Sequence, residues 1–264
     1  LQLNLPVVPV TDLAIKDNDL VAATAGRAFW ILDDLSPVQE AANVLAGKQL
    51  KIISPKATIR YKGAAPGQTQ EDALGKNPVE GVILDYYIPS KPDGEEVKLI
   101  IQNEAGVTVR SYSSKKDETF KRYAGGPPPP VTLPAAEGMN RFAWDFRGEN
   151  IQPDISGVYI NGDYKGYRLA PGTYKAVLSF KGNSTETRFT VLADPNLSVT
   201  QGDWDAQQAF LQKLSANISD IHTHFNNTNQ LKKQIEHYNS LLKEDNKALI
   251  DAGKELIKKI TDWQ

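Results

Sequence analysis

The chain has 264 residues, of which 40% are hydrophobic and 23% are charged, with a formal net charge of −2 at pH 7 and no cysteine. These values are typical of a globular protein with one or two domains. They exclude disulfides, thiolate metal sites and cysteine nucleophiles, and the small net charge argues against a nucleic-acid partner. No apolar run approaches the ~20 residues that are needed to span a bilayer.

The first 35 residues are predicted to form short β-strands. Residues 20–24 and 28–32 are apolar, and Ala25-Gly26-Arg27 separates them. Two strands with a Gly-Arg break between them are typical of part of a β-propeller blade. Asp33-Asp34 follows, and Ser36-Pro37 then predicts the start of a short helix. The chain begins at Leu1 inside a strand-like pattern, which favours a fragment of a longer protein.

A connecting segment leads to a region of alternating apolar and polar residues. Residues 51–53 and 58–61 are compatible with strands, whereas residues 63–77 are rich in Gly, Ala, Gln and charge and are predicted to form an exposed loop. From residue 81 onward, short alternating stretches recur about every 10 residues between turn signals, which is typical of an antiparallel sandwich. They are residues 81–88, 97–101, 107–111, 140–146, 174–180 and 186–192.

Residues 138–192 contain the clearest strand signals. Phe142, Trp144 and Phe146 alternate with polar or small residues, so the pattern predicts three aromatic side chains on one face of a strand. Pro171-Gly172 and residues 181–184 predict turns on either side of the next strand. We expect about seven strands in an immunoglobulin-like arrangement, which is not of the antibody type because the chain lacks cysteine.

The last 65 residues are predicted to be helical. Three amphipathic stripes recur at spacings of three and four residues after Thr200 or Asp203, either of which can cap the first helix. Residues 226–229 are expected to weaken or end that helix, and residues 244–246 to break it again. The stripes predict a helical hairpin or a three-helix bundle that still continues at Gln264.

Several of these motifs together resemble a known family. The segment DNDLVAATAGRAFWILDDLSPVQ (residues 17–39) resembles the end of the β-propeller in bacterial sortilin-like (VPS10/BNR-repeat) proteins, which are often described as glycosyl hydrolases. GMNRFAWDFR (residues 138–147) and PGTY (residues 171–174) are similar to the C-terminal extension of that family, and the sandwich is similar to FlgD-like modules. The resemblance implies a propeller upstream of Leu1 and a location outside the cytoplasm: periplasmic, on the cell surface or secreted. The BNR motif SxDxGxTW occurs nowhere in the chain.

The sequence thus predicts a mainly β protein with a C-terminal α region. Its expected parts are a remnant of the last propeller blade and a linker (residues 1–45), an Ig-like antiparallel β-sandwich (residues 46–194) and a helical region (residues 195–264).

Three groups of residues are candidates for chemistry. Asp33-Asp34 is a carboxylate pair, but adjacent residues that leave a strand point in different directions, so turn and cap chemistry is the favoured interpretation. His222 and His224 do not share a helix face, and no nearby carboxylate completes a metal site. The sequence therefore predicts no catalytic residue, no metal and no cofactor.

Aromatic residues in a loop form the third group. Tyr159, Tyr164 and Tyr167 lie between two strands and are the candidate residues for stacking against a sugar, although burial against an edge of the sandwich is the more common use of such rings.

Three functions remain open at this point. The first is a non-catalytic structural or interaction module, whose partner is the protein's own upstream propeller and whose ligand is a glycan or a protein. The second is a carbohydrate-binding module, and the third is an accessory part of a glycoside hydrolase whose active site lies in the propeller. Unpaired strand edges in the first 35 residues also predict a homodimer through the N-terminal strands.

Overall fold

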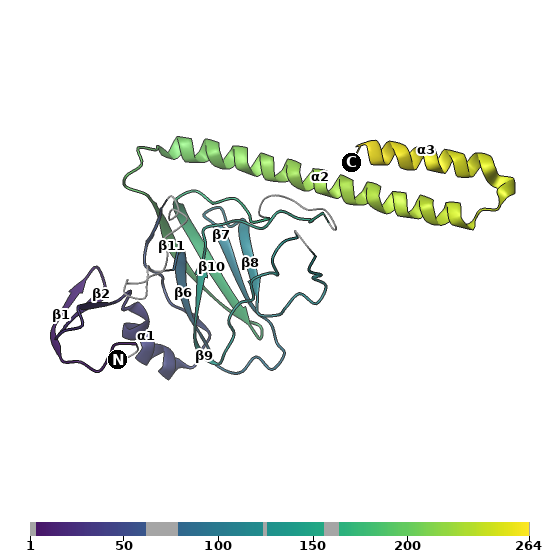
Figure 1. Cartoon of the computed structure of the whole chain (residues 1–264). Helices are drawn as coiled ribbons and strands as arrows, with labels where there is room; N and C mark the ends of the chain where they lie inside the picture. Colours follow the sequence, from purple (N-terminus) through teal and green to yellow (C-terminus); the bar gives the residue numbers. More distant parts are fainter. Residues whose placement is uncertain (1–3, 62–78, 124–125, 156–163, 264) are drawn as a thin grey trace. The chain divides into compact units, whose positions relative to one another are not determined.

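A computed structural model describes residues 4–61, 79–123, 126–155 and 164–263 (Figure 1). The chain divides into two compact units. The first comprises Leu1–Lys116, Val131–Arg147 and Arg168–Val199, and the second comprises Asp117–Pro130, Gly148–Tyr167 and Thr200–Gln264. The predicted loop at residues 63–77 falls outside the described residues.

The N-terminal strands form a sheet of their own. Its strands β1 (Val10–Lys16), β2 (Asp19–Thr24) and β3 (Phe29–Leu32) are antiparallel and lie in that order. Asp17 and Asn18 both have positive φ between β1 and β2, which is the conformation of a tight hairpin turn and suits these two residue types. Helix α1 (Ser36–Gly47) follows β3 and has a proline in its first turn, where the missing N–H costs nothing.

The first unit also contains a β-sandwich made of two sheets. One sheet has five strands in the order β5-β11-β10-β7-β8, and the other has three in the order β4-β6-β9. All pairings are antiparallel except β5 with β11, which is parallel. The strands are β4 (Lys51–Ile52), β5 (Thr58–Arg60), β6 (Val82–Ile88), β7 (Val97–Asn103), β8 (Thr108–Ser113), β9 (Gly138–Trp144), β10 (Gly172–Phe180) and β11 (Asn183–Ala193).

Aromatic side chains from both sheets fill the core. The ring of Trp144 on β9 is fully buried and lies 5.1 Å from the ring of Tyr174 on β10 and 5.8 Å from that of Phe189 on β11. Burial alternates along β10 as its sequence predicted. The predicted aromatic face is confirmed, although Phe146 lies beyond the end of β9, has a φ of 60° and is nevertheless buried.

The second unit contains a helical hairpin. Helix α2 (Gln201–Leu241) begins with a reciprocal capping box between Thr200 and Asp203, and a 3₁₀ turn (Glu244–Asn246) connects it to α3 (Lys247–Trp263). The protein is therefore mainly β with a C-terminal α region, an antiparallel sandwich followed by a hairpin (Figure 1).

The predicted break at residues 226–229 is wrong, because α2 runs through it without interruption. The side-chain amide of Asn226 donates to the backbone oxygen of Asp154 at 2.8 Å, a contact outside the helix. The Thr228 hydroxyl bonds back to the oxygen of His224 at 3.0 Å, one turn earlier, and so stays within the helix. The low helix propensity of such residues costs only about 0.5 kcal/mol each, which the Asn226 contact helps to offset.

Candidate interaction surface

The N-terminal sheet β1–β3 carries apolar side chains on both of its faces. Residues that pair across antiparallel strands share a face. Leu13, Ala22 and Trp30 are paired in one row, and Ala14, Val21 and Ile31 in the neighbouring row, which points to the opposite face. A sheet with one solvated face alternates apolar and polar residues, so this pattern is that of a sheet covered on both sides.

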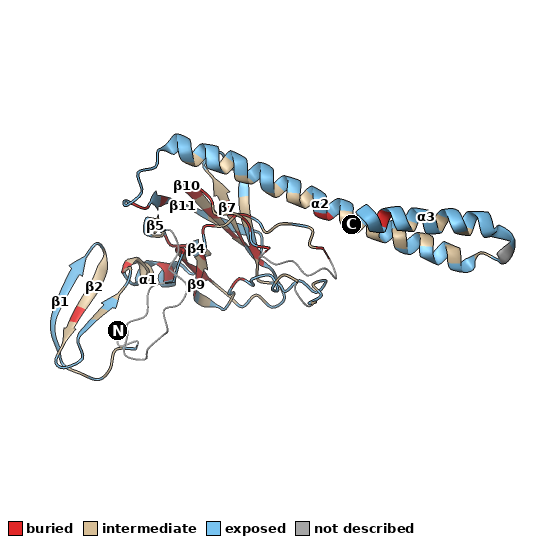
Figure 2. Cartoon of the chain, turned by 45° about the horizontal axis from the view of Figure 1, so that its top comes forward, coloured by how far each residue is buried: buried red, intermediate tan, exposed pale blue. Residues whose placement is uncertain are grey.

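Much of this apolar surface is exposed. Every residue of β1 is exposed, and Phe29 on β3 retains 73% of its accessible surface (Figure 2). The large exposed apolar side chains of the sheet are Val10, Leu13, Ile15, Phe29 and Ile31. Isolated exposed apolar residues are ordinary, but a cluster on one small sheet marks an interaction surface. We call these three strands the blade sheet.

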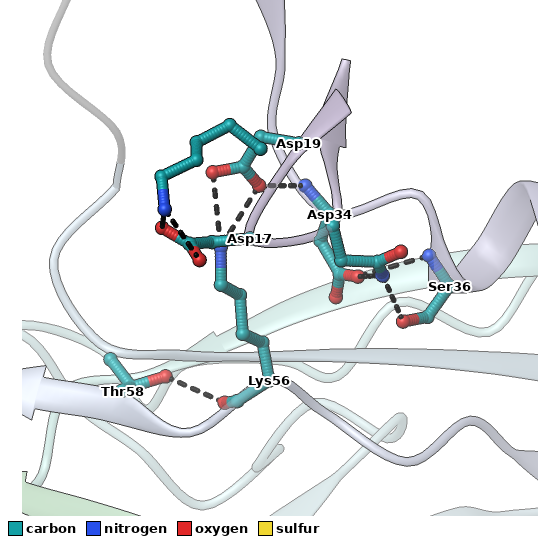
Figure 3. Close-up of polar contacts among 8 residues, drawn as sticks. Asp17, Asp19, Asp34, Ser36, Lys56 and Thr58 are labelled. Atoms are coloured by element: carbon teal, nitrogen blue, oxygen red, sulfur yellow. Dashed lines mark hydrogen bonds and ion pairs between the residues drawn. The ribbon is translucent and has the colours of Figure 1, made fainter. Parts of the chain in front are cut away.

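A polar network fixes the end of the blade sheet (Figure 3). The carboxylate of Asp19 accepts hydrogen bonds from the Asp34 amide at 2.8 Å and from the Lys56 ammonium at 3.0 Å. The side-chain amide of Asn18 donates to the Asp34 carboxylate at 3.1 Å and to the Ser36 hydroxyl at 2.9 Å. The sheet is thus tied both to the start of α1 and to the segment before β5.

These contacts set the ionisation of Asp19. Partial burial is the largest single effect and opposes the charged form. The hydrogen bonds from the Asp34 amide and from Lys56, together with the Lys56 charge, outweigh it and lower the pKa of Asp19 below its usual value. The ion pair is partly exposed, so it holds the blade sheet in place without contributing a large free energy.

The predicted turn role of Asp33-Asp34 is confirmed for Asp34, whereas the predicted cap role is not, because the N-cap of α1 is Leu35 and it has no side-chain cap hydrogen bond. Asp34 has a φ of 56°, and its carboxylate accepts from the backbone amide of Ser36 at 3.0 Å, at the first residue of α1. The carboxylates of Asp34 and Asp33 also contribute to raising the pKa of Arg141, whose largest cause is its hydrogen bond to Asp85. The pair is therefore used for local structure and for charge balance beside Arg141.

The three candidate sugar-binding tyrosines differ in position. Tyr159 falls outside the described residues. Tyr164 is buried and its ring lies 6.4 Å from that of His222, whereas Tyr167 is half-buried, and its burial raises the pKa of its hydroxyl. A sugar-stacking ring needs an open face, so Tyr164 is poorly placed for this role. A glycan site at the other two tyrosines stays a prediction.

Buried polar contacts connect residues 148–155 to α2 within the second unit. The carbonyl of Pro153 can only accept, so Nδ1 of His222, 2.7 Å away, carries the proton. The hydroxyl of Tyr123 lies 3.0 Å from the carboxylate of Asp154 and 2.8 Å from the oxygen of Ile155. Burial and the neighbouring Tyr164 and Asp154 side chains raise the pKa of the Tyr123 hydroxyl. His222 thus has a structural use, which the HxH spacing alone did not reveal.

Groups of three or more His, Cys, Asp and Glu side chains that could hold a metal ion are missing from the described part of the chain. In the same part, none of the helices combines the length and the apolar character that a bilayer-spanning segment requires.

Comparisons with known proteins yield a structural similarity. No protein-family model matches the chain, and no curated protein matches it. Among solved structures the chain is similar to PorZ, described as an essential bacterial surface component of the type-IX secretion system of Porphyromonas gingivalis, with 18% identity over 70% of this chain and 23% of that chain. The chain spans less than a quarter of the length of PorZ, and the TM-score is 0.21, too low to equate the two folds.

Sequence reasoning located the blade sheet but missed two features that decide its character. It did not recognise that both faces are apolar, and the register of β1 against β2 shows which side chains share each face. It also missed Lys56, because nothing in the surrounding sequence pairs this residue with Asp19, 37 positions earlier. A signal for the first feature was present, since residues 20–24 lack strict alternation.

Proposed function

We propose that this chain is a structural and interaction module without catalytic activity of its own, and that the blade sheet completes the last blade of an upstream β-propeller. The observation that carries this proposal is the pair of apolar faces on the blade sheet together with its fully exposed strand β1. A propeller blade lies between two neighbouring blades and has four strands, so both faces and one more edge need partners. The resemblance of residues 17–39 to the end of a sortilin-like propeller supports the same arrangement.

The sandwich then serves as a rigid support that follows the propeller. Its core is closed by side chains of its own two sheets, and the ion pair between Asp19 and Lys56 fixes the blade sheet at the segment before β5. From the resemblance we also propose that the protein acts outside the cytoplasm, in the periplasm, on the cell surface or in a secreted form.

The proposal predicts that one substitution changes the melting temperature differently in the present chain and in the full product of the reading frame. Ile31→Glu places a charge on an exposed position of the present chain, where it should change the melting temperature by less than a degree or two. In the full product of the reading frame, a neighbouring blade would cover Ile31, and an unpaired buried charge costs about 3–5 kcal/mol. We therefore expect a loss of several degrees in the longer protein only.

Val107→Glu is the matched control, because Val107 is similarly exposed but lies between β7 and β8, away from the blade sheet. It should be harmless in both proteins. An equally small effect of Ile31→Glu in both lengths, or a reading frame without repeated blades upstream of Leu1, would overturn the proposal.

Hydrogen exchange distinguishes the alternative of a homodimer through the N-terminal strands. In a propeller module, the β1 amides of the present chain that point away from β2 exchange rapidly at every concentration, because none of the strands in the described residues pairs with that edge. Protection of the β1 amides that increases with the concentration of the present chain would instead support strand exchange or edge pairing between copies.

A further inference from the structure

The helical hairpin has a second apolar face besides the one that joins its two helices. Side chains that face the partner helix include Ile235 on α2, Leu242 directly after it, and Ile250, Ile257 and Ile260 on α3, all of them partly or fully buried. A further six large side chains retain 43% to 66% of their surface, and they are Leu231, Tyr238, Leu241, Leu249, Leu256 and Trp263. We call these six residues the open face; Figure 2 shows how little of the hairpin is buried.

All six residues lie on one side of the hairpin. Successive residues are rotated by about 100° around the helix axis. Measured around each axis against the direction in which the chain advances, the open-face residues of α2 lie about 90° from the side that faces α3. Those of α3 lie about 80°, in the same sense, from the side that faces α2. The two helices run in opposite directions, so an offset in the same rotational sense places both stripes on the same side. Leu249, Leu256 and Trp263 follow at intervals of seven residues, as in a helix that packs along its whole length.

The register of the hairpin arranges the open face in layers. Lys232 on α2 donates to the hydroxyl of Thr261 on α3 at 2.9 Å, and a Cβ on Gly253 would come within 2.6 Å of the side chain of Asn239. These two contacts define which positions of the helices are level with each other. They place Leu231 level with Trp263, Tyr238 level with Leu256, and Leu241 level with Ala252, so the open face is a continuous strip.

We propose that the open face binds the open face of a second copy of this chain, and that the two hairpins form a four-helix bundle. A helix in a two-helix hairpin needs only a narrow seam, whereas a helix in a four-helix bundle contacts two neighbours about 90° apart. The offsets of about 80° and 90° between the two seams fit the four-helix arrangement better than the 60° that a single added helix would require.

The register shows which charged residues at the outer edges of the open face would meet. The edge of α2 carries Lys233 and His237, and the edge of α3 carries Asp262 and Glu255, the second of which pairs with Lys259 at 2.9 Å. If α2 of one copy packs against α3 of the other, His237 comes level with Glu255, and Lys233 comes level with Lys259, less than one turn from Asp262. We place α2 of one copy against α3 of the other, with the two-fold axis along the bundle, so that all neighbouring helices are antiparallel.

The size of the face predicts how strong the dimer is. Helix α3 has 17 residues, which correspond to about 25 Å, and two helices side by side are about 20 Å wide. The projected interface is then about 500 Å² per copy, or about 1,000 Å² in total, at the lower limit for specific complexes. We expect a dimer that dissociates on dilution into the low micromolar range.

Sedimentation velocity of the present chain, from low micromolar to several hundred micromolar, tests this assembly. We expect a monomer–dimer equilibrium that Tyr238→Glu and Leu256→Glu each shift at least tenfold toward the monomer. Ile221→Glu is the control, because Ile221 is equally exposed on α2 but lies outside the stretch that α3 accompanies. Far-UV circular dichroism verifies that each variant keeps its helices.

Cross-linking provides a second readout that does not depend on weakening the protein. The chain has no cysteine, so Leu241→Cys chains can be mixed with Ala252→Cys chains under mild oxidation. Packing of α2 against α3 of the other copy predicts a disulfide-linked heterodimer in the mixture and little product from either variant alone. A monomer at every concentration would overturn the proposal. A dimer that Ile31→Glu abolishes while Leu256→Glu leaves it intact would overturn it as well, and would place the contact in the blade sheet.

Discussion

Replacing Trp144 by alanine should destabilise the sandwich more than replacing any exposed residue. The indole is fully buried, its ring contacts Phe146, Tyr174 and Phe189, and its Nε1 donates to the oxygen of Arg147 at 2.9 Å. Removal of a large buried aromatic side chain costs about 3–5 kcal/mol, because it loses apolar burial and leaves a cavity. Loss of the hydrogen bond from Nε1 adds to that cost, and the expected total is therefore near the upper end, about 5 kcal/mol.

The natural control is Trp263→Ala, since Trp263 is 59% exposed at the end of α3. At concentrations where the chain is monomeric, this substitution should change stability by less than about 0.5 kcal/mol. Because the chain has two compact units, a global melting curve need not be two-state. Urea-dependent amide exchange of β10 therefore serves as the assay. A loss below about 1.5 kcal/mol for Trp144→Ala would contradict the view that this aromatic cluster holds the two sheets together.

Three further results are expected. Gly81→Ala should destabilise the sandwich by several kcal/mol or prevent folding, because Gly81 has a φ of 129° and a Cβ there would overlap the carbonyl oxygen of Trp144. Soluble yield and thermal denaturation measure this effect. The pKa of Asp19 is lower in the folded than in the unfolded chain. Its contribution to the free energy of unfolding is therefore present above about pH 4 and is lost as the pH falls through the folded pKa. Urea denaturation should show that the free energy of unfolding falls less between pH 7 and pH 3 for Asp19→Asn than for the unaltered chain. If the loop tyrosines bind a glycan, a soluble oligosaccharide at 100 times its dissociation constant should stabilise the chain by about 2.7 kcal/mol, and Tyr167→Ala should abolish that thermal shift.

Much of the sandwich could be predicted because its signals are local. Alternation along β10 and the Pro171-Gly172 turn depend only on the period of a strand and on backbone dihedral preferences. The parallel pairing of β5 with β11 could not be predicted in this way, because it joins Thr58 to Val191 across more than a hundred residues. All three residues of β5, Thr58 to Arg60, are half-buried, so the short segment has no alternation of its own.

In the helical region, a tertiary contact also overrides what the local sequence predicts. Residue types predicted an interruption of α2 at Asn226, and the helix continues because a carbonyl from a distant loop accepts its amide. Intrinsic helix propensities differ by tenths of a kcal/mol per residue, so a single tertiary hydrogen bond reverses the preference. The true break at Glu244–Asn246 was predicted correctly, where a 3₁₀ turn separates two stripes.

The two exposed apolar surfaces of this chain call for occupants of different kinds. The blade sheet has apolar residues on opposite faces, so a single flat partner would cover only half of it, whereas the open face of the hairpin lies on one side and needs one partner layer. The sandwich needs neither, because Trp144 and its neighbours are buried by the two sheets themselves. Substitutions inside the sandwich should therefore change folding at every protein concentration. Charged substitutions on the open face should change only concentration-dependent association, and those on the blade sheet should change stability only when the upstream residues are present.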